Sequence, residues 1–261
     1  MKQAFIVILT LLLFNRSVIG QSPKPKIDTS TQKIEKTIFA CGASIEKTYI
    51  KYVVALTKKV KPKICFIPTA VYDDPLAIIQ WYEDCSTLNV IPSVLKTYVE
   101  SDPSQQTFEE QLLDCDAIIV YGGSTLNMLA IWTAQGIDTV LRKAYDKGII
   151  LAGGSAGSLC WFTGGFTDSR PKYLSQIDCL GFLNYSHCPH FGNINRKTLY
   201  EEAILNHKLK EGYACDNLSG LLFVNGVLKK SVSQNKDNNN YFISVKDGKI
   251  NEELLPAEII Q

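Results

Sequence analysis

The chain is short of histidine and has almost no excess of either charge. Its 27 basic and 26 acidic side chains leave a formal net charge of +1 over 261 residues. This balance offers no electrostatic reason to expect a nucleic acid or an anionic membrane as a partner. With 3 histidines in the whole chain, a reaction that needs an imidazole base has few candidates. No internal repeat divides the sequence, and its length and 46% hydrophobic content are typical of a single domain with one core.

The N-terminal apolar run is too short to span a bilayer comfortably. It covers residues 4–14, and small residues that suit signal-peptidase cleavage follow it. We therefore predict a secretory signal peptide at 1–20, a flexible lead-in at 21–34 and one domain at 35–261. A retained membrane anchor is the alternative, whereas the absence of a cysteine directly after the run argues against a lipoprotein. The mature protein is expected to be secreted or periplasmic, without stable membrane association.

Closely spaced cysteine pairs are absent as well. The 8 cysteines are spread along the chain without a C-x-x-C pair, and Cys65 lies within an apolar run typical of a strand. An even count in a secreted chain favours disulfides, whereas a domain of this size also accommodates small buried thiols. The sequence leaves both alternatives open. It also leaves open the oligomeric state, for which a homodimer is one alternative.

Apolar, strand-like segments alternate with segments of helical spacing. Strands are predicted at 37–40, 63–68, 90–99, 117–121 and 149–152, and helices at 45–59, 75–88 and 125–146. Continuous apolar strands between amphipathic helices predict a three-layer α/β/α fold with a mostly parallel sheet. Towards the C-terminus, Asn225-Gly226 and Asp247-Gly248 each predict the turn of a β-hairpin.

Glycine-rich turns follow the last two predicted strands of the sheet. Gly153, Ser155 and Gly157 fit the G-x-S-x-G pattern of a nucleophile elbow, a sharp turn that exposes a serine between a strand and a helix. Because the carboxyl ends of parallel strands meet at one edge, we expect Gly123 near this serine. The backbone N–H groups of Gly123 and Ala156 are then predicted to form an oxyanion hole. An ordinary tight turn is the alternative for the Gly122-Gly123 pair.

A serine nucleophile needs a base, and the three histidines are the candidates for that role. His207 lies in a charged helical stretch and is predicted to be solvated. His187 and His190 flank Cys188-Pro189, whose proline holds the backbone extended. Such a run presents metal ligands poorly, so no metal site is expected there.

The base in turn needs a group that holds its second ring nitrogen. Asp168 lies between the predicted elbow and the histidine segment, and an Asx turn in Thr167-Asp168-Ser169 is its alternative role. Asp178 and Asp216 are further candidates, and spacing alone does not choose among the three.

Three motifs, in this order, resemble the peptidase E (aspartyl dipeptidase) and cyanophycinase family of serine peptidases. They are Gly122-Gly123-Ser124-Thr125, Gly154-Ser155-Ala156-Gly157 and Cys188-Pro189-His190-Phe191. The resemblance extends over about Ile38 to Val245 and implies a class I glutamine amidotransferase-like, flavodoxin-like fold. It implies Ser155 as nucleophile, His190 as base and Asp168 as the third triad member, with Gly123 and Ala156 as oxyanion donors. Ser124 departs from the family, in which asparagine is common at this position.

The resemblance also implies a substrate class, a short aspartyl peptide or a related amide, and no cofactor. Arg170, Lys172 and Arg196 are near the predicted triad in sequence, and an arginine there is suited to binding a carboxylate through two hydrogen bonds. Two other hypotheses remain. An α/β-hydrolase esterase shares the elbow and the Ser, Asp, His order but places its histidine later in the chain. A non-enzymatic binding protein on the same scaffold is the other, since a fold does not guarantee an activity.

Overall fold

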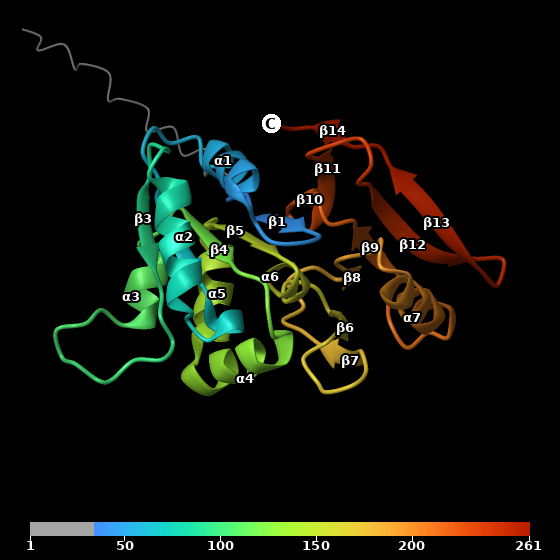
Figure 1. Cartoon of the computed structure of the whole chain (residues 1–261), viewed down its shortest axis with the longest axis horizontal. Coiled ribbons are helices and arrows are strands. Elements are labelled where there is room, and N and C mark those ends of the chain that lie inside the picture. The colour runs from blue at the N-terminus through green and yellow to red at the C-terminus, as the bar shows by residue number, and fades with distance from the viewer. Residues whose placement is uncertain (1–33) are drawn as a thin grey trace, which may run out of the picture. The chain divides into compact units, whose positions relative to one another are not determined.

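The computed structural model describes residues 34–261, so the predicted signal peptide and nearly all of the predicted lead-in lie outside the described residues. An eight-stranded sheet forms the centre of this part of the chain (Figure 1). Its order is β14 (Glu258–Ile259), β11 (Val227–Ser233), β10 (Ser219–Val224), β1 (Thr37–Cys41), β5 (Ile150–Gly154), β4 (Ala117–Val120), β2 (Lys63–Ile67) and β3 (Ile91–Val94). The strands β1, β5, β4, β2 and β3 are parallel, and β10 joins β1 in antiparallel register.

Helices cover both faces of this sheet and build two apolar cores. One core packs α1 (Lys47–Leu56) and α2 (Pro75–Cys85) against one face. The other packs α3 (Phe108–Leu113), α4 (Thr125–Gln135), α5 (Ile137–Asp146) and the short α6 (Ala156–Leu159) against the opposite face. The inner parallel strands β1, β5 and β4 are covered on both sides and all of their residues are buried, whereas the edge strand β3 is partly exposed. The predicted three-layer α/β/α fold with a mostly parallel sheet is confirmed.

The helix predicted at 125–146 is in fact two helices. Gly136 has φ 73° and ends α4, and α5 begins at the next residue. Glycine reaches this left-handed conformation without steric cost, so it breaks the helix although the apolar spacing continues across it.

The C-terminal part adds a second sheet that the apolar pattern did not predict. Its order is β13 (Lys249–Leu255), β12 (Asn240–Lys246), β9 (Gly212–Cys215) and β8 (Ser186–Cys188), and α7 (Ile194–Leu205) packs beside it (Figure 1). The predicted hairpins are confirmed: Asn225-Gly226 joins β10 to β11, and Asp247-Gly248 joins β12 to β13, with positive φ at all four residues. A small sheet of β6 (Gly164–Thr167) and β7 (Ser175–Asp178) lies between α6 and β8 in the chain.

All of the cysteines lie in the described part of the chain and are free thiols there. All but Cys179 are buried, which matches the buried-thiol alternative. Burial raises the pKa of the Cys188 and Cys179 thiols to about 12 and so keeps them protonated near neutral pH. Within residues 34–261, no helix combines the length and the apolar character that a membrane span requires.

Candidate active site

Ser155 stands on a strained turn between β5 and α6. Its backbone has φ 53° and ψ −116°, a conformation that L residues rarely adopt. Small neighbours make the turn feasible: a Cβ on Gly153 would lie 2.1 Å from the carbonyl oxygen of Gly157, and one on Gly157 would lie 2.2 Å from that of Val120. The predicted strand-to-helix elbow is therefore present, with the serine at its apex.

His190 is in hydrogen-bond contact with this serine. The distance from His190 Nε2 to Ser155 Oγ is 2.8 Å. The chain after β8 reaches the elbow because the His190 N–H donates to the carbonyl of Gly42, in the loop after β1, at 3.2 Å. His190 has φ 57°, a second strained residue within the same site. The structure thus brings together the serine and the histidine that the sequence predicted.

The group on the other ring nitrogen of His190 is an amide and not a carboxylate. Asn217 Oδ1 lies 2.7 Å from His190 Nδ1, whereas Asp168 Oδ2 accepts from Arg196 Nη2 at 2.6 Å. Asp216 is engaged elsewhere too, since its Oδ2 accepts from the Asn239 N–H at 2.9 Å. The prediction that Asp168 holds the imidazole is wrong in this structure, because the guanidinium of Arg196 competes for its carboxylate.

An amide oxygen at this position has a defined consequence. By accepting from Nδ1–H, Asn217 holds His190 in the tautomer whose Nε2 is free to accept the serine proton. It does so without adding a negative charge. Burial lowers the pKa of His190, the hydrogen bond to Asn217 opposes that shift, the nearby Arg196 charge adds to it, and the Asp168 charge opposes it. The imidazole therefore stays neutral, and able to act as a base, to a pH below its ordinary pKa.

The two residues predicted to form an oxyanion hole have free backbone N–H groups in the described part of the chain and belong to adjoining turns. Gly123 has φ 135°, and a Cβ there would lie 2.3 Å from the carbonyl oxygen of Ala70, so glycine is required. Among residues 34–261, the N–H groups of Gly123 and Ala156 donate to no protein acceptor. The two turns adjoin, because a Cβ built on Gly122 would lie 3.1 Å from the Cβ of Ser155. Ser124 caps α4 through its hydroxyl, a role that asparagine fills equally well.

His187 is excluded as the base by its surroundings. It is fully buried, and its ring lies flat against Phe162 at 4.3 Å. Its Nδ1 lies 3.0 Å from the Tyr213 carbonyl and its Nε2 3.1 Å from Ser158 Oγ. Burial lowers the pKa of His187 to about 3, so the ring is neutral in the folded protein.

Of the three cations predicted near the triad, only one lies at the site. Arg170 is exposed and donates to Ser175 Oγ at 2.8 Å, and Lys172 is exposed as well. Arg196 alone lies at the site, in a cavity of about 610 Å³ that also includes Asp168, His190 and Asn217. His207 is exposed, as predicted. Within residues 34–261, no cluster of three or more acidic, histidine or cysteine side chains is arranged to hold a metal ion.

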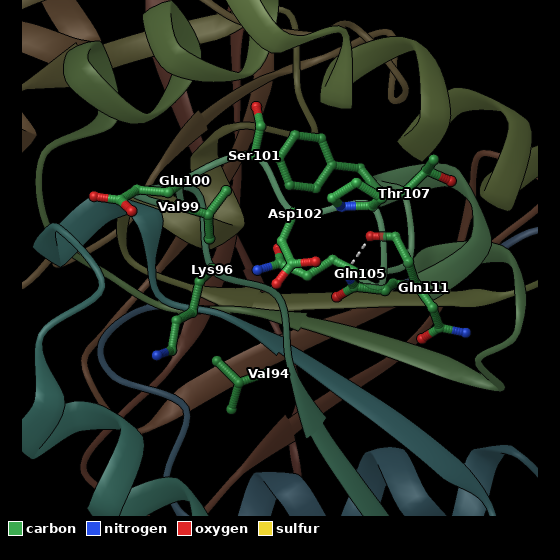
Figure 2. Close-up of a pocket in the computed structure, with 12 residues that line it drawn as sticks. Val94, Lys96, Val99, Glu100, Ser101, Asp102, Gln105, Thr107 and Gln111 are labelled. Atoms are coloured by element: carbon green, nitrogen blue, oxygen red, sulfur yellow. Dashed lines mark hydrogen bonds between the residues drawn. The ribbon is translucent and has the colours of Figure 1, made fainter.

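A cavity of about 810 Å³ lies away from these residues, at the β3 edge of the sheet. Figure 2 shows the side chains of Lys96, Glu100, Asp102 and Gln111, from the segment after β3 and from α3, around it. None of the predicted site residues lines this cavity.

Comparison with known proteins identifies a peptidase family. Residues 39–230 match the model of Peptidase family S51. The chain is 36% identical over 211 residues to the uncharacterised peptidase YgaJ of Bacillus subtilis (strain 168), covering 80% of this chain and 90% of that protein.

Solved structures share the fold. A candidate peptidase E protein of Listeria monocytogenes EGD-e superposes with a TM-score of 0.59 at 18% identity, covering 77% of this chain and all of that one. A peptidase from an acI-B1 actinobacterium superposes with a TM-score of 0.67 at 16% identity, covering 86% and 96% of the two chains.

Proposed function

This chain belongs to peptidase family S51 and is a serine peptidase, and from that premise we propose that Ser155 is its nucleophile, His190 its general base and Asn217 the residue that orients the base. The observation that carries the proposal is the 2.8 Å contact between Ser155 Oγ and His190 Nε2 on a strained elbow. Asn217 takes the position that the resemblance assigned to Asp168.

The reaction divides into two steps. Ser155 Oγ attacks the carbonyl carbon of the scissile bond while its proton moves to His190 Nε2, and the oxyanion accepts hydrogen bonds from the N–H groups of Gly123 and Ala156. His190 then gives the proton to the departing amine as the C–N bond breaks, which leaves an acyl-enzyme. A water molecule, deprotonated by the same imidazole, releases the acyl group.

The aspartyl preference implied by the resemblance is proposed with Arg196 as its recognition residue. Arg196 is 9% exposed and lies in the same cavity as His190, unlike Arg170. Its partner Asp168 has a side chain that is 68% exposed and so is free to swing away. An incoming substrate carboxylate would replace Asp168 on the guanidinium and form the same charge-assisted hydrogen bonds.

Labelling by a fluorophosphonate tests the nucleophile without knowledge of the natural substrate. Wild-type protein should be labelled on Ser155, and Ser155→Ala should abolish the label. Ser158→Ala is the matched control, because Ser158 is fully buried three residues later and should leave labelling in place. His190→Gln should slow labelling by at least 10²-fold, whereas His187→Gln should change it by less than about 10-fold. Labelling that persists in Ser155→Ala would refute the proposal.

A further inference from the structure

Asn217 reaches His190 from the turn that runs from Asp216 to Ser219, between β9 and β10. The Ser219 N–H closes this turn by donating to the Asp216 carbonyl at 3.1 Å, and the Ser219 hydroxyl donates to the same oxygen at 3.1 Å. These bonds fix the peptide unit before Asn217. Because Asn217 is exposed, packing restrains its side chain little, and the direction of its amide also depends on the peptide unit after it.

The peptide unit after Asn217 is fixed by the side chain of Asn238, in the loop between β11 and β12. The Leu218 N–H donates to Asn238 Oδ1 at 3.0 Å. Within residues 34–261, this is the only hydrogen bond of the peptide unit that joins Asn217 to Leu218. Without Asn238 Oδ1 that N–H would lose its acceptor, so the peptide plane would be free to rotate and the Asn217 side chain would be held less firmly.

Asn238 is itself held in one orientation by Asn235. Asn238 Nδ2 donates to Asn235 Oδ1 at 3.0 Å, and the backbone N–H groups of Asp237 and Asn238 donate to the same oxygen, each at 3.0 Å. Since the amide nitrogen of Asn238 faces an acceptor, its amide oxygen is directed at the donor, the Leu218 N–H. One asparagine side chain thus orders the loop, and the other contacts the turn that carries Asn217.

Backbone groups hold the rest of this loop, residues 234–239, beside the turn. The Asp216 N–H donates to the Asn239 carbonyl at 3.0 Å, and Asp216 Oδ2 accepts from the Asn239 N–H at 2.9 Å. At the other end of the loop, the Gln234 N–H donates to the Leu218 carbonyl at 2.9 Å. Both ends are therefore anchored without the Asn238 side chain, so removing that side chain should alter the turn locally and leave the loop in place.

The contacts of His190 are sensitive to a change in this turn. Asn217 Oδ1 lies 2.7 Å from His190 Nδ1, and His190 Nε2 lies 2.8 Å from Ser155 Oγ, so a displaced amide also displaces the base from the nucleophile. A misplacement of about 1 Å can cost about 10²-fold in rate. The loop also borders the site directly, because Asp237 and Asn238 line the cavity of about 610 Å³ that contains His190.

We propose that Asn238 is a positioning residue that acts on His190 through Asn217. By holding the Leu218 N–H, it directs the Asn217 amide at the imidazole and so favours the tautomer that accepts the serine proton. This inference rests on the role of Asn217 proposed above and extends it to the loop at 234–239. Because Asn238 acts only through Asn217, its effect must vanish when the Asn217 amide is absent.

A double-mutant cycle in the full chain tests this coupling through the rate of fluorophosphonate labelling. Asn238→Ala should slow labelling on the alkaline plateau by about 10-fold in the wild-type background and by less than about 2-fold in Asn217→Ala. The acid midpoint of labelling should also fall in Asn238→Ala, because the hydrogen bond that raises the pKa of His190 is weakened. The charges of Arg196 and Asp168, which also act on His190, are the same in all of these variants.

A role of Asn238 in folding alone gives a different pattern. It would slow labelling equally in both backgrounds and leave the acid midpoint in place; either result, or an unchanged rate in Asn238→Ala, would overturn the inference. Asn89→Ala is the matched control, because Asn89 Nδ2 also bonds to the backbone, donating to the Val60 carbonyl at 2.8 Å, and its loss should change neither rate nor midpoint. If Asn238→Ala does not fold, Asn235→Ala removes the acceptor that orients Asn238, and it should show the same lowered midpoint and the same dependence on Asn217.

A histidine titration distinguishes failure of this inference from failure of the proposed function. In the full chain carrying Ser155→Ala, the ring-proton NMR resonances of His190 report its pKa without any catalysis. Asn238→Ala should lower that pKa, and should leave it in place when Asn217→Ala is also present. A lowered pKa in a protein whose wild-type form is not labelled on Ser155 would refute the peptidase mechanism and keep the positioning role. Labelling of Ser155 that is slowed by Asn217→Ala, with an unmoved pKa in Asn238→Ala, would keep the mechanism and refute the inference.

Discussion

Replacing Asn217 by aspartate tests whether the neutral amide of Asn217 orients His190 and so influences its pKa. In the wild-type protein the pKa of His190 is lowered, mainly by burial, and the only help from Asn217 is a hydrogen bond. Asn217→Asp would place a negative charge at nearly the same 2.7 Å contact and stabilise the imidazolium. The pKa of His190 must then rise, and the pH below which the imidazole is protonated and inactive as a base must rise with it.

The size of this shift follows from the exposure of the residue. Two unit charges about 4 Å apart interact by about 1 kcal/mol in bulk water and about 4 kcal/mol at an effective dielectric constant of 20. Asn217 is exposed while His190 is partly buried, so the interaction should lie near the lower figure, at about 1.4 to 2 kcal/mol. This corresponds to a rise of roughly one pKa unit.

The assay is the rate of fluorophosphonate labelling of Ser155 between pH 4.5 and 8.5 at constant ionic strength. The wild-type acid midpoint should lie below the ordinary histidine pKa of about 6.5. Asn217→Asp should raise that midpoint by about one unit, and Asn217→Ala should lower it, because the hydrogen bond that raises the pKa of His190 is lost. Asn217→Ala should also slow labelling on the alkaline plateau by about 10- to 10³-fold through the freed imidazole.

Asp168→Asn is the control that distinguishes Asn217 from Asp168 as the residue that orients His190. If Asn217 orients the base, Asp168→Asn should keep the plateau rate within about 3-fold of wild type. A large loss in Asp168→Asn, together with an unaffected Asn217→Ala, would refute the assignment and restore the carboxylate as the third member of a triad.

Three further outcomes are expected. Arg196→Gln should raise KM for aspartyl peptides by at least 10-fold and leave matched alanyl peptides within about 2-fold, since it removes a carboxylate contact and no catalytic group. Gly123→Ala should lower kcat by at least 10²-fold because its Cβ would lie 2.3 Å from the Ala70 carbonyl oxygen; Gly136→Ala, where nothing lies within 4 Å, should cost only stability, about 1 kcal/mol. His187 is neutral in the fold with a pKa of about 3 but binds a proton below about pH 6.5 when unfolded, so urea titrations should show stability falling by roughly 1 kcal/mol per pH unit from pH 6.5 towards 3, and by less in His187→Gln.

Local patterns predicted the parts of the site that depend on backbone conformation. Ser155 and Gly123 belong to short glycine-rich turns. The steric requirement for glycine depends on a few neighbouring residues, so a short sequence pattern predicts it. The hairpin turns at Asn225-Gly226 and Asp247-Gly248 are of the same kind, since positive φ is a property of single residues. The alternation of apolar strands and helices likewise predicted the parallel sheet.

Local patterns could not predict hydrogen-bond partners that are distant in the chain. Asn217 is 27 residues from His190, and it reaches the imidazole from the turn between β9 and β10. Asn217 is not a carboxylate, so the residue type expected of a third triad member does not point to it, although it directly follows the candidate Asp216. Asp168 has the expected residue type, but its carboxylate is held by Arg196, 28 residues further along on α7.

The sequence by itself therefore determined the strained turn at Ser155, the histidine that follows Pro189, the glycine at position 123 and the class of fold. Each of these is governed by sterics or by apolar periodicity within one or two elements. The tertiary structure alone decided which side chain holds His190 and which cation lies at the site. These depend on how side chains from separate elements compete for the same partners, and that competition is resolved only when the sheets and helices pack together.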